Sequence, residues 1–262
     1  MGNASLPITL HGVGVQYDMR LSRKRRLRGT LIGKYKNAEA KKFWALRNID
    51  LDVKHGESLA VIGNNGAGKS TLLQTLAGII TPDEGEIEGR GRISTLLNLG
   101  AGFEDDLDAE ENILLAGEYL GIPHTTIRRK LNEIIGFADI GKFAHMPART
   151  YSSGMRARLG FSVATAVDPD VLLLDEVMAT GDAAFAEKSR ARVLELMDRA
   201  RAIVFVTHDL EAAEKFCNRA IEIEKGEIIA AGTPAQVIAG YKKRNSITGP
   251  SSLGKRGPRT AI

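Results

Sequence analysis

Short apolar runs alternate with longer amphipathic stretches along most of this chain. Strict alternation, as in TLHGVGVQY, predicts half-buried strands, and continuous apolar runs predict buried ones. The expected strands are 8–17, 46–53, 58–62, one or two within 87–97, 171–174, 202–206, and a hairpin of 220–223 with 227–231. The expected helices are 70–78, 112–120, 126–137, 153–167, 184–199 and 210–216. Strands that alternate with helices predict an α/β fold with a parallel sheet, flanked by antiparallel strands from both ends of the sequence.

Composition narrows the class without changing this picture. The 262 residues are 43% hydrophobic and 26% charged, which predicts a soluble globular chain with a full core. The longest apolar runs are far shorter than the roughly 20 residues of a membrane helix, and the start does not have the pattern of a secretory signal. The single cysteine, Cys217, excludes an internal disulfide framework and is expected to be buried. Residues 245–262 are rich in Gly, Pro and Ser and predict a disordered basic tail.

Charge is unevenly distributed along the sequence. The net charge is +4, but residues 20–42 carry +9 and residues 241–262 carry +6, so the rest of the chain carries −11. Basic segments of this kind bind nucleic acid, anionic lipid headgroups or anionic substrates, or remain a solvated surface. Leu27 and Leu31 lie one helical turn apart within the first basic segment. A short amphipathic helix at a membrane surface and a solvated loop are both open for that segment.

A glycine-rich loop predicts phosphate binding. It matches the pattern G-x-x-x-x-G-K-[ST], follows an apolar strand and precedes a helix. The residues of the loop are Gly63, Asn64, Asn65, Gly66, Ala67, Gly68, Lys69, Ser70 and Thr71. Glycines let the backbone turn its N–H groups toward phosphate oxygens, and the helix adds its positive end. Lys69 is expected on the β- and γ-phosphates, and the Ser70 hydroxyl is expected to hold Mg²⁺.

Two carboxylates and a histidine follow later strands. Asp175 ends the buried strand 171–174 and is expected to coordinate Mg²⁺ through water. Glu176 is the candidate general base that accepts a proton from the attacking water. His208 follows the strand 202–206 and is a second candidate catalytic residue, within reach of the γ-phosphate.

The order of these motifs resembles the nucleotide-binding subunit of an ABC transporter. The resemblance covers roughly residues 7–240 and implies an α/β, ABC-type P-loop ATPase domain over 1–244, with ATP and Mg²⁺ as ligands. Its fold has a mixed sheet core, an antiparallel β subdomain and a helical subdomain at about 104–168. The family's signature, usually LSGGQ, stands here as Tyr151, Ser152, Ser153, Gly154 and Met155. In the family this segment faces the ATP of the opposite subunit, which implies a head-to-tail homodimer.

The resemblance implies roles for further residues. Asp182, in ATGD, is expected to communicate across the dimer. Tyr17 is the aromatic residue expected to stack on adenine, with Trp44 as the second candidate. The family's usual Gln between the phosphate loop and the signature is not plainly present, and Asn98 or Glu104 stands near its place.

YSSGM, ATGD and the LLNLGAGF run at 96–103 resemble a narrower branch, the ATPase subunits of exporters of lipid-linked polysaccharides. Members of that branch carry an insert between the first two strands, here 18–43, and a loop near Leu99-Gly100 that approaches the membrane. The implied function is ATP-driven export of such a glycan across the cytoplasmic membrane. The implied partners are a transmembrane permease and, through residues 20–42, the membrane surface or the glycan. The implied location is the cytoplasmic face, as a peripheral subunit.

Two alternatives remain at this point. One is an ABC ATPase for another cargo, such as a lipid, drug or nutrient, which shares all the ATP chemistry. The other is a soluble, non-transport ABC protein that acts on ribosomes or DNA. Ribosomal members generally carry two phosphate loops in one chain and DNA-repair members carry long coiled coils, so we expect no nucleic-acid partner. Because the sequence stops at 262, we also expect no separate glycan-recognition domain.

Overall fold

The computed structural model describes residues 7–18, 42–89, 91–96, 99–100, 102–175 and 183–247. A three-stranded antiparallel sheet in the order β2-β1-β4 is formed by β1 (Ile8–Asp18), β2 (Lys42–Val53) and β4 (Glu84–Gly89). β1 and β2 pair from Ile8 opposite Val53 to Asp18 opposite Lys42. The predicted first strand and the longer second strand therefore form one hairpin. The insert, predicted at 18–43, is shorter, because Asp18 ends β1 and Lys42 and Phe43 begin β2; residues 19–41 lie outside the described residues.

A six-stranded sheet carries the main core. Its order is β5-β6-β7-β3-β8-β9, with β3 (Glu57–Ile62), β5 (Ile93–Thr95), β6 (Val171–Leu174), β7 (Ala202–Val206), β8 (Arg219–Glu224) and β9 (Glu227–Gly232). All neighbours are parallel except β8 and β9, which form the predicted hairpin around Lys225 and Gly226. Both turn residues have positive φ, 51° and 84°, as a tight hairpin turn requires. The predicted α/β class with a mixed sheet is confirmed.

Both faces of this sheet are covered. Leu59 and Val61 point into one apolar cluster, and their neighbours Ala60 and Ile62 point into another. The first cluster joins the sheet to the three-stranded sheet and to α2 (Lys69–Leu76). The second joins it to α6 (Ala183–Arg199), α7 (Leu210–Phe216) and α8 (Pro234–Ile247). Burial on two faces explains why these strands read as continuous apolar runs.

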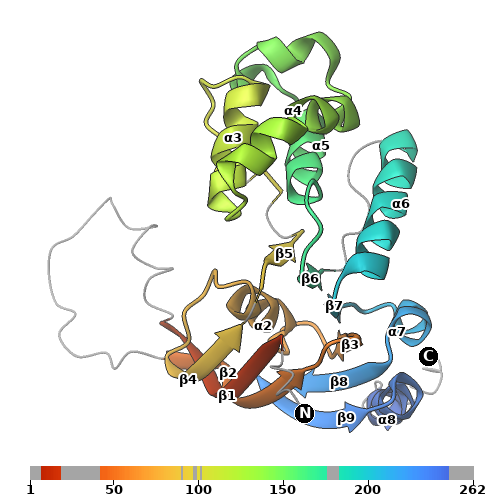
Figure 1. Ribbon diagram of the computed structural model, residues 1–262. Helices are drawn as coiled ribbons and strands as arrows, with labels where there is room; N and C mark the ends of the chain where they lie inside the picture. The colour runs from red at the N-terminus through yellow and green to blue at the C-terminus, as the bar shows by residue number, and fades with distance from the viewer. Residues whose placement is uncertain are drawn as a thin grey trace, which may run out of the picture.

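A third apolar cluster belongs to a separate helical unit. It is formed by α3 (Ala109–Tyr119), α4 (His124–Ala138), α5 (Ser153–Ala164) and two short 3₁₀ turns, η1 (Gly141–His145) and η2 (Ala148–Thr150). These helices gather at the end of the molecule away from the three-stranded sheet (Figure 1). Asp108 and Glu111 form a capping box that begins α3, and Pro123 stands immediately before α4.

The bounds of α2, α3, α4 and α6 differ from the prediction by one to three residues at an end, and the differences at α5 and α8 have a cause visible in the structure. α5 ends at Ala164, three residues before the predicted end, because Thr165 caps it: the hydroxyl of Thr165 donates to the Phe161 carbonyl at 2.8 Å, and the Thr165 carbonyl accepts from Arg192. α8 was not predicted, and it continues through the first three residues of the predicted tail. Thr233 and Gln236 exchange backbone–side-chain hydrogen bonds around Pro234, which is a capping signal present in the sequence.

Candidate functional site

The candidate site lies where three adjacent parallel strands end. β6, β7 and β3 are neighbours in that order, so the residues that follow them meet at one edge of the sheet. The phosphate loop follows β3, Asp175 follows β6, and His208 comes two residues after β7. The structure thus brings together three features that are up to 145 residues apart in the sequence.

The shape of the phosphate loop depends on two glycines. Gly63 has φ 151° and lies so close to the Ile223 carbonyl of β8 that a Cβ would collide with it. Gly68 has φ 112°, and a Cβ there would lie 2.5 Å from the Ala45 carbonyl oxygen of β2. Both positions therefore require glycine, for conformation and for space. Gly66 also has positive φ, but open space surrounds it.

Lys69 folds back onto its own loop. Its ammonium donates to the Gly63 carbonyl at 2.7 Å and to the Asn64 carbonyl at 3.1 Å. These contacts hold the charge at the centre of the loop, where phosphate oxygens bind in this type of loop. α2 begins at Lys69, so the free N–H groups of its first turn, at Ser70 and Thr71, face the same space.

A cavity of about 340 Å³ is lined by the phosphate loop, by the residue after β6 and by two aromatic residues of β1 and β2. Its lining includes Lys69 and Ser70, Asp175, and the exposed rings of Tyr17 and Phe43. The remaining lining residues are Ala45, Asn65, Gly66, Gly68, Thr71 and Val206. Asp175 and Ser70 therefore present oxygen atoms to the same space, as the predicted magnesium site requires.

Phe43 is a site residue that the sequence reading missed. It pairs directly with Tyr17 across the first hairpin, so both rings lie on the same face of the sheet. Trp44, the second candidate of the sequence analysis, points to the other face. There its ring lies 2.9 Å from where a Cβ on Gly14 would be, and Arg47 packs over it at 6.0 Å. Trp44 is a packing residue, and Phe43 is the aromatic neighbour that lines the cavity.

The segment around His208 is fixed by local hydrogen bonds. Thr207 is buried, its N–H donates to the Val61 carbonyl at 3.3 Å, and its hydroxyl accepts from the Asp209 N–H at 2.9 Å. Asp209 caps α7 through two hydrogen bonds of 3.0 Å. His208 between them is exposed at the strand end. Glu176, Asp182 and Asn98 lie outside the described residues.

The signature segment lies in the helical unit, at the start of α5. The Ser152 hydroxyl accepts from the Met155 N–H at 3.2 Å and begins the helix, and Ser152 and Ser153 are exposed. A Cβ on Gly154 would meet only the Ser152 hydroxyl oxygen, at 3.8 Å, so a ligand can approach the first turn closely. The cavity's described lining contains none of these residues.

Tyr151, the first residue of the signature, packs into the helical unit. Its side chain is buried in the core of the helical unit, and within the described part of the chain its hydroxyl has no hydrogen-bond partner. Burial, with a smaller contribution from the Asp108 carboxylate, raises the pKa of the Tyr151 phenol, and Arg156 opposes that shift. The ring therefore stays neutral and does not face solvent. Met155 packs partly against the same core.

Comparison with known proteins identifies the family. Residues 46–179 match the family model described as ABC transporter. The O-antigen export system ATP-binding protein RfbB of Myxococcus xanthus is 40% identical over 92% of this chain and 58% of that protein. The chain belongs to the ABC transporter family. The teichoic acids export ATP-binding protein TagH of Lactococcus lactis is 40% identical over 82% of this chain and 46% of that protein. This ABC family member thus spans about half the length of these relatives.

Solved structures agree on the fold. A dimeric ATP-binding cassette in a post-hydrolysis state, bound to ADP and Pi, has a TM-score of 0.62 and 23% identity, and the match covers 87% of this chain and 98% of that chain. The fold is therefore that of an ABC-type cassette, as the resemblance implied.

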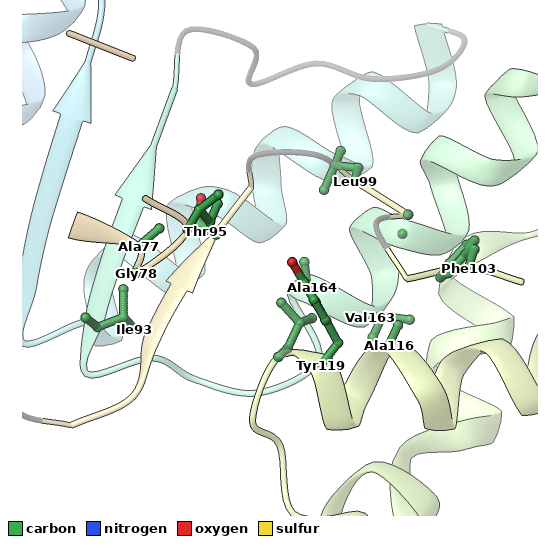
Figure 2. Close-up of a pocket in the computed structure, with 14 residues that line it drawn as sticks. Ala77, Gly78, Ile93, Thr95, Leu99, Phe103, Ala116, Tyr119, Val163 and Ala164 are labelled. Atoms are coloured by element: carbon green, nitrogen blue, oxygen red, sulfur yellow. The ribbon is translucent and has the colours of Figure 1, made fainter. Parts of the chain in front are cut away.

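A second cavity of the ABC cassette, of about 330 Å³, lies between the sheet and the helical unit. Ala77, Ile93 and Thr95 lie on one side of it, and Phe103, Ala116 and Val163 on the other (Figure 2). Leu99 and Gly100, which the resemblance places near the membrane, line it as well. At its rim Ile79 and Tyr119 are 45% and 66% exposed, unusually high for large apolar side chains.

This second cavity is called the apolar groove below. The loop at 104–108 beside it is held by a buried asparagine that the sequence did not predict. Asn112 is fully buried; its side-chain oxygen accepts from the Glu104 N–H at 2.7 Å, and its amide donates to the carbonyls of Glu104, Leu107 and Asp108. Glu104, a candidate for the missing Gln, is exposed beside it. Only three-dimensional packing distinguishes this asparagine from a surface residue on α3.

Proposed function

We propose that this chain is the ATP-hydrolysing subunit of an ABC exporter that moves a lipid-linked polysaccharide across the cytoplasmic membrane. The observation that carries the proposal is one cavity that Lys69, Ser70 and Asp175 line together. These are the cation, the hydroxyl and the carboxylate that a phosphate-binding loop uses with a nucleoside triphosphate and Mg²⁺.

The residues of this cavity fit magnesium and ATP. The Ser70 hydroxyl and the Asp175 carboxylate are oxygen ligands, which Mg²⁺ prefers, and among the described residues no cluster of three His, Cys, Asp or Glu suggests another metal. These two side chains would hold Mg²⁺, which would supply positive charge against the phosphates. Lys69 would exchange its two loop carbonyls for phosphate oxygens, and the first turn of α2 would donate its N–H groups.

Two further residues are proposed to act on the reacting atoms. His208 stands at the end of β7, beside both Asp175 and the phosphate loop in strand order, and would steady the γ-phosphate. Glu176 follows Asp175 directly in the sequence and would accept a proton from the attacking water. Its structure is outside the described residues.

We further propose a head-to-tail homodimer. The exposed first turn of α5 supplies Ser152, Ser153 and Gly154 to the nucleotide held by the phosphate loop of a second subunit. Asp182, outside the described residues, would carry the signal between the two sites. The signature residues do not line the cavity of their own subunit among the described residues, and this supports a contact with the nucleotide of a second subunit.

A transmembrane permease is the proposed partner at the apolar groove between the sheet and the helical unit. Exposed Ile79 and Tyr119 at the rim support it, since such side chains mark interaction sites. No helix within the described residues is long and apolar enough to cross a bilayer. The proposed location is therefore the cytoplasmic face of the membrane, bound through this partner.

The cargo is inferred from the relatives whose names specify O-antigen and teichoic acid export. The +9 segment at 20–42, of which the structure describes only Lys42 in β2, is proposed to contact the anionic membrane surface or the lipid-linked glycan. Loss of surface glycan in cells that lack this chain would support that cargo. Neutralising Arg23–Arg26 should then reduce export and leave ATP hydrolysis intact. Unchanged glycan export in the deletion strain would favour a different cargo.

Hydrolysis of ATP by the purified chain, and its loss in Glu176→Gln, tests the enzyme proposal. The variant removes the general base but none of the phosphate contacts, so it should bind ATP at wild-type affinity and lose turnover by about 10²-fold or more. Glu187→Gln, an exposed change of the same kind on α6, is the matched control and should hydrolyse normally. Retained steady-state hydrolysis in Glu176→Gln would refute the assignment.

A further inference from the structure

The exposed turn of the phosphate loop is attached to the C-terminal helix. On one side of the turn Gly63 packs against β8, and on the other the Ala67 carbonyl accepts from the Gly226 N–H at 2.8 Å. Residues 64–66 between these anchors are exposed. There the Tyr241 hydroxyl donates to Oδ1 of Asn64 at 2.9 Å, and Nδ2 of Asn64 donates to Oδ1 of Asn245 at 3.2 Å. Both polar atoms of one loop side chain are therefore held by α8.

α8 is a firm support for these contacts. Val237 and Ile238 are buried in the core on the α8 side of the sheet, with 3% and 4% exposure. Further along the helix, Arg244 forms an ion pair with Glu222 of β8, whose side chain is almost fully buried. The hydrogen bond that Arg244 donates to the Glu222 carboxylate raises the pKa of Arg244, so the guanidinium stays charged. β8 thus anchors α8 and also supplies the Ile223 carbonyl against which Gly63 packs.

Tyr241 and Asn245 share one face of the helix because they are four residues apart. The amide of Asn245 also donates to the Tyr241 carbonyl at 3.1 Å, which fixes the orientation of the group that receives Asn64. The two side chains therefore act as one unit toward the loop.

Asn64, which they hold, is also one of the two residues whose carbonyls accept from the Lys69 ammonium. The Asn64 carbonyl accepts from the Ala67 N–H and from the Lys69 ammonium, both at 3.1 Å. When Lys69 turns to phosphate oxygens, this carbonyl gives up one of these two donors. The side-chain contacts of Asn64 with α8 do not depend on Lys69, so they can keep the turn in place throughout that exchange.

We propose that Tyr241 and Asn245 are positioning residues that preorganise the phosphate loop through Asn64. The inference rests on the proposed function, because it assumes that ATP binds at this loop. A loop held in its binding conformation loses less conformational freedom when a ligand binds. The contacts should therefore strengthen nucleotide binding and leave the turnover of bound ATP unchanged.

Tyr241→Phe tests this by removing only the hydroxyl. The dissociation constant for a fluorescent ATP analogue with Mg²⁺, and the KM for ATP, should rise about two- to fivefold, with kcat unchanged, as expected for the loss of one hydrogen bond. Lys243→Ala, an exposed neighbour on the same helix, is the control and should bind normally. Melting temperatures of both variants should match the wild type. Unchanged affinity in Tyr241→Phe, or an equal loss of kcat, overturns the proposal.

A double-mutant cycle shows whether the effect passes through Asn64. In an Asn64→Ala background, Tyr241→Phe should have no further effect on affinity. The same loss in both backgrounds would mean that the hydroxyl acts elsewhere, and the proposal fails. Lys69→Ala separates the two levels of inference. If it binds nucleotide as tightly as the wild type, the proposed function itself is wrong. If it loses binding while Tyr241→Phe does not, only the positioning role is wrong.

Discussion

The aromatic rings of Tyr17 and Phe43 lie on the same face of the sheet and line the cavity beside the phosphate loop. They are 43% and 52% exposed, so the described residues leave about half of each side chain uncovered. Purine rings stack on such surfaces, at about 1–3 kcal/mol for each aromatic contact. With ATP bound at Lys69 as proposed, the pair would form a platform for the base.

Removing either ring should weaken ATP binding. Tyr17→Ala and Phe43→Ala are each expected to raise the KM for ATP about fivefold or more, with little change in kcat, because stacking contributes equally before and during reaction. Steady-state kinetics over a range of ATP concentrations would measure this. Trp44→Leu is the comparison: it should lower the melting temperature and leave KM unchanged. A KM effect for Trp44 and none for Phe43 would reverse the assignment.

Cys217 is expected to be chemically inert in the folded protein. Burial raises the pKa of its thiol to about 12, whereas in an unfolded chain it is about 8.5. Alkylation by iodoacetamide at pH 8 should therefore be at least about a hundredfold slower in the native protein than in denaturant. Labelling at equal rates in both states would show that the thiol is not buried.

The same shift gives a pH dependence with a defined sign. The folded state keeps a proton that the unfolded chain releases, so the contribution of Cys217 to the free energy of unfolding is complete below about pH 8.5. It is lost as the pH rises from there toward about 12. Cys217→Ala should remove this part of the alkaline loss of stability.

Individual site residues were predictable where a local pattern fixes them. Lys69, Ser70 and Asp175 follow from a loop motif and an apolar strand end, and the structure places all three in one cavity. Phe43 and Asn112 were not predictable in this way. The role of Phe43 depends on its lying opposite Tyr17 in the hairpin, and that of Asn112 depends on the loop carbonyls around it. That information lies in the register and in packing, which a linear pattern does not contain.

At the level of elements, α5 and the loop before the helical unit are in direct backbone contact. A Cβ on Gly160 would collide with the Gly100 nitrogen and lie 2.8 Å from the Leu99 carbonyl carbon. Neither backbone group can move aside as a flexible side chain would. Because α5 also begins with the signature, this contact joins the groove to the proposed dimer surface through one helix.

Gly160→Ala should therefore destabilise the protein. Overpacking of this kind costs about 1–3 kcal/mol, and the free energy of unfolding in urea would measure it. Gly136→Ala is a matched control, since Gly136 also lies in a helix but has open space around it. The control should stabilise by about 0.5–1 kcal/mol, the usual gain of alanine over glycine in a helix. Equal effects at the two positions would contradict the contact.

Elements with strong periodicity or continuous apolar runs were predicted closely. The bounds expected for β6, β7 and α7 are those observed. α8 was missed because small and polar residues dilute its apolar face, so its only strong signal was the cap around Pro234. The early end of α5 depends on Arg192 reaching across from α6, a tertiary contact that no window of sequence reports.

For the whole molecule, each proposed site combines the phosphate loop of one subunit with the signature of the other. Two variants that are inactive alone should therefore regain ATP hydrolysis when they form a mixed dimer. Lys69→Ala should inactivate the phosphate loop. Gly154→Asp should place a negative charge where the partner's γ-phosphate would lie, and an acidic residue in the first turn of α5 favours the helix. In a mixed dimer, one site combines both defects and the other has neither.

Mixing the two variants in equal amounts should therefore recover about a quarter of wild-type ATP hydrolysis, since about half of the dimers are mixed and each has one intact site. Each variant alone, at the same total concentration, provides the baseline. No recovery after subunit exchange, verified by differently tagged chains, would mean that each subunit works with its own signature. Hydrolysis by either variant alone would show that the altered residue is dispensable.

The third apolar cluster has an evolutionary consequence. All of its members lie between Phe103 and Val167, so one continuous stretch of sequence encodes a unit that packs against itself. The first cluster has no member within that stretch, whereas the second takes Phe161 and the partly buried Phe137 from it. Recombination between relatives at the two ends of this stretch would therefore leave the first and third cores unmixed, and the second core would meet the exchanged unit through these two aromatic residues. A single genetic event would then replace the signature and Tyr119 of the proposed permease contact, while the phosphate loop, Asp175 and His208 would be inherited intact.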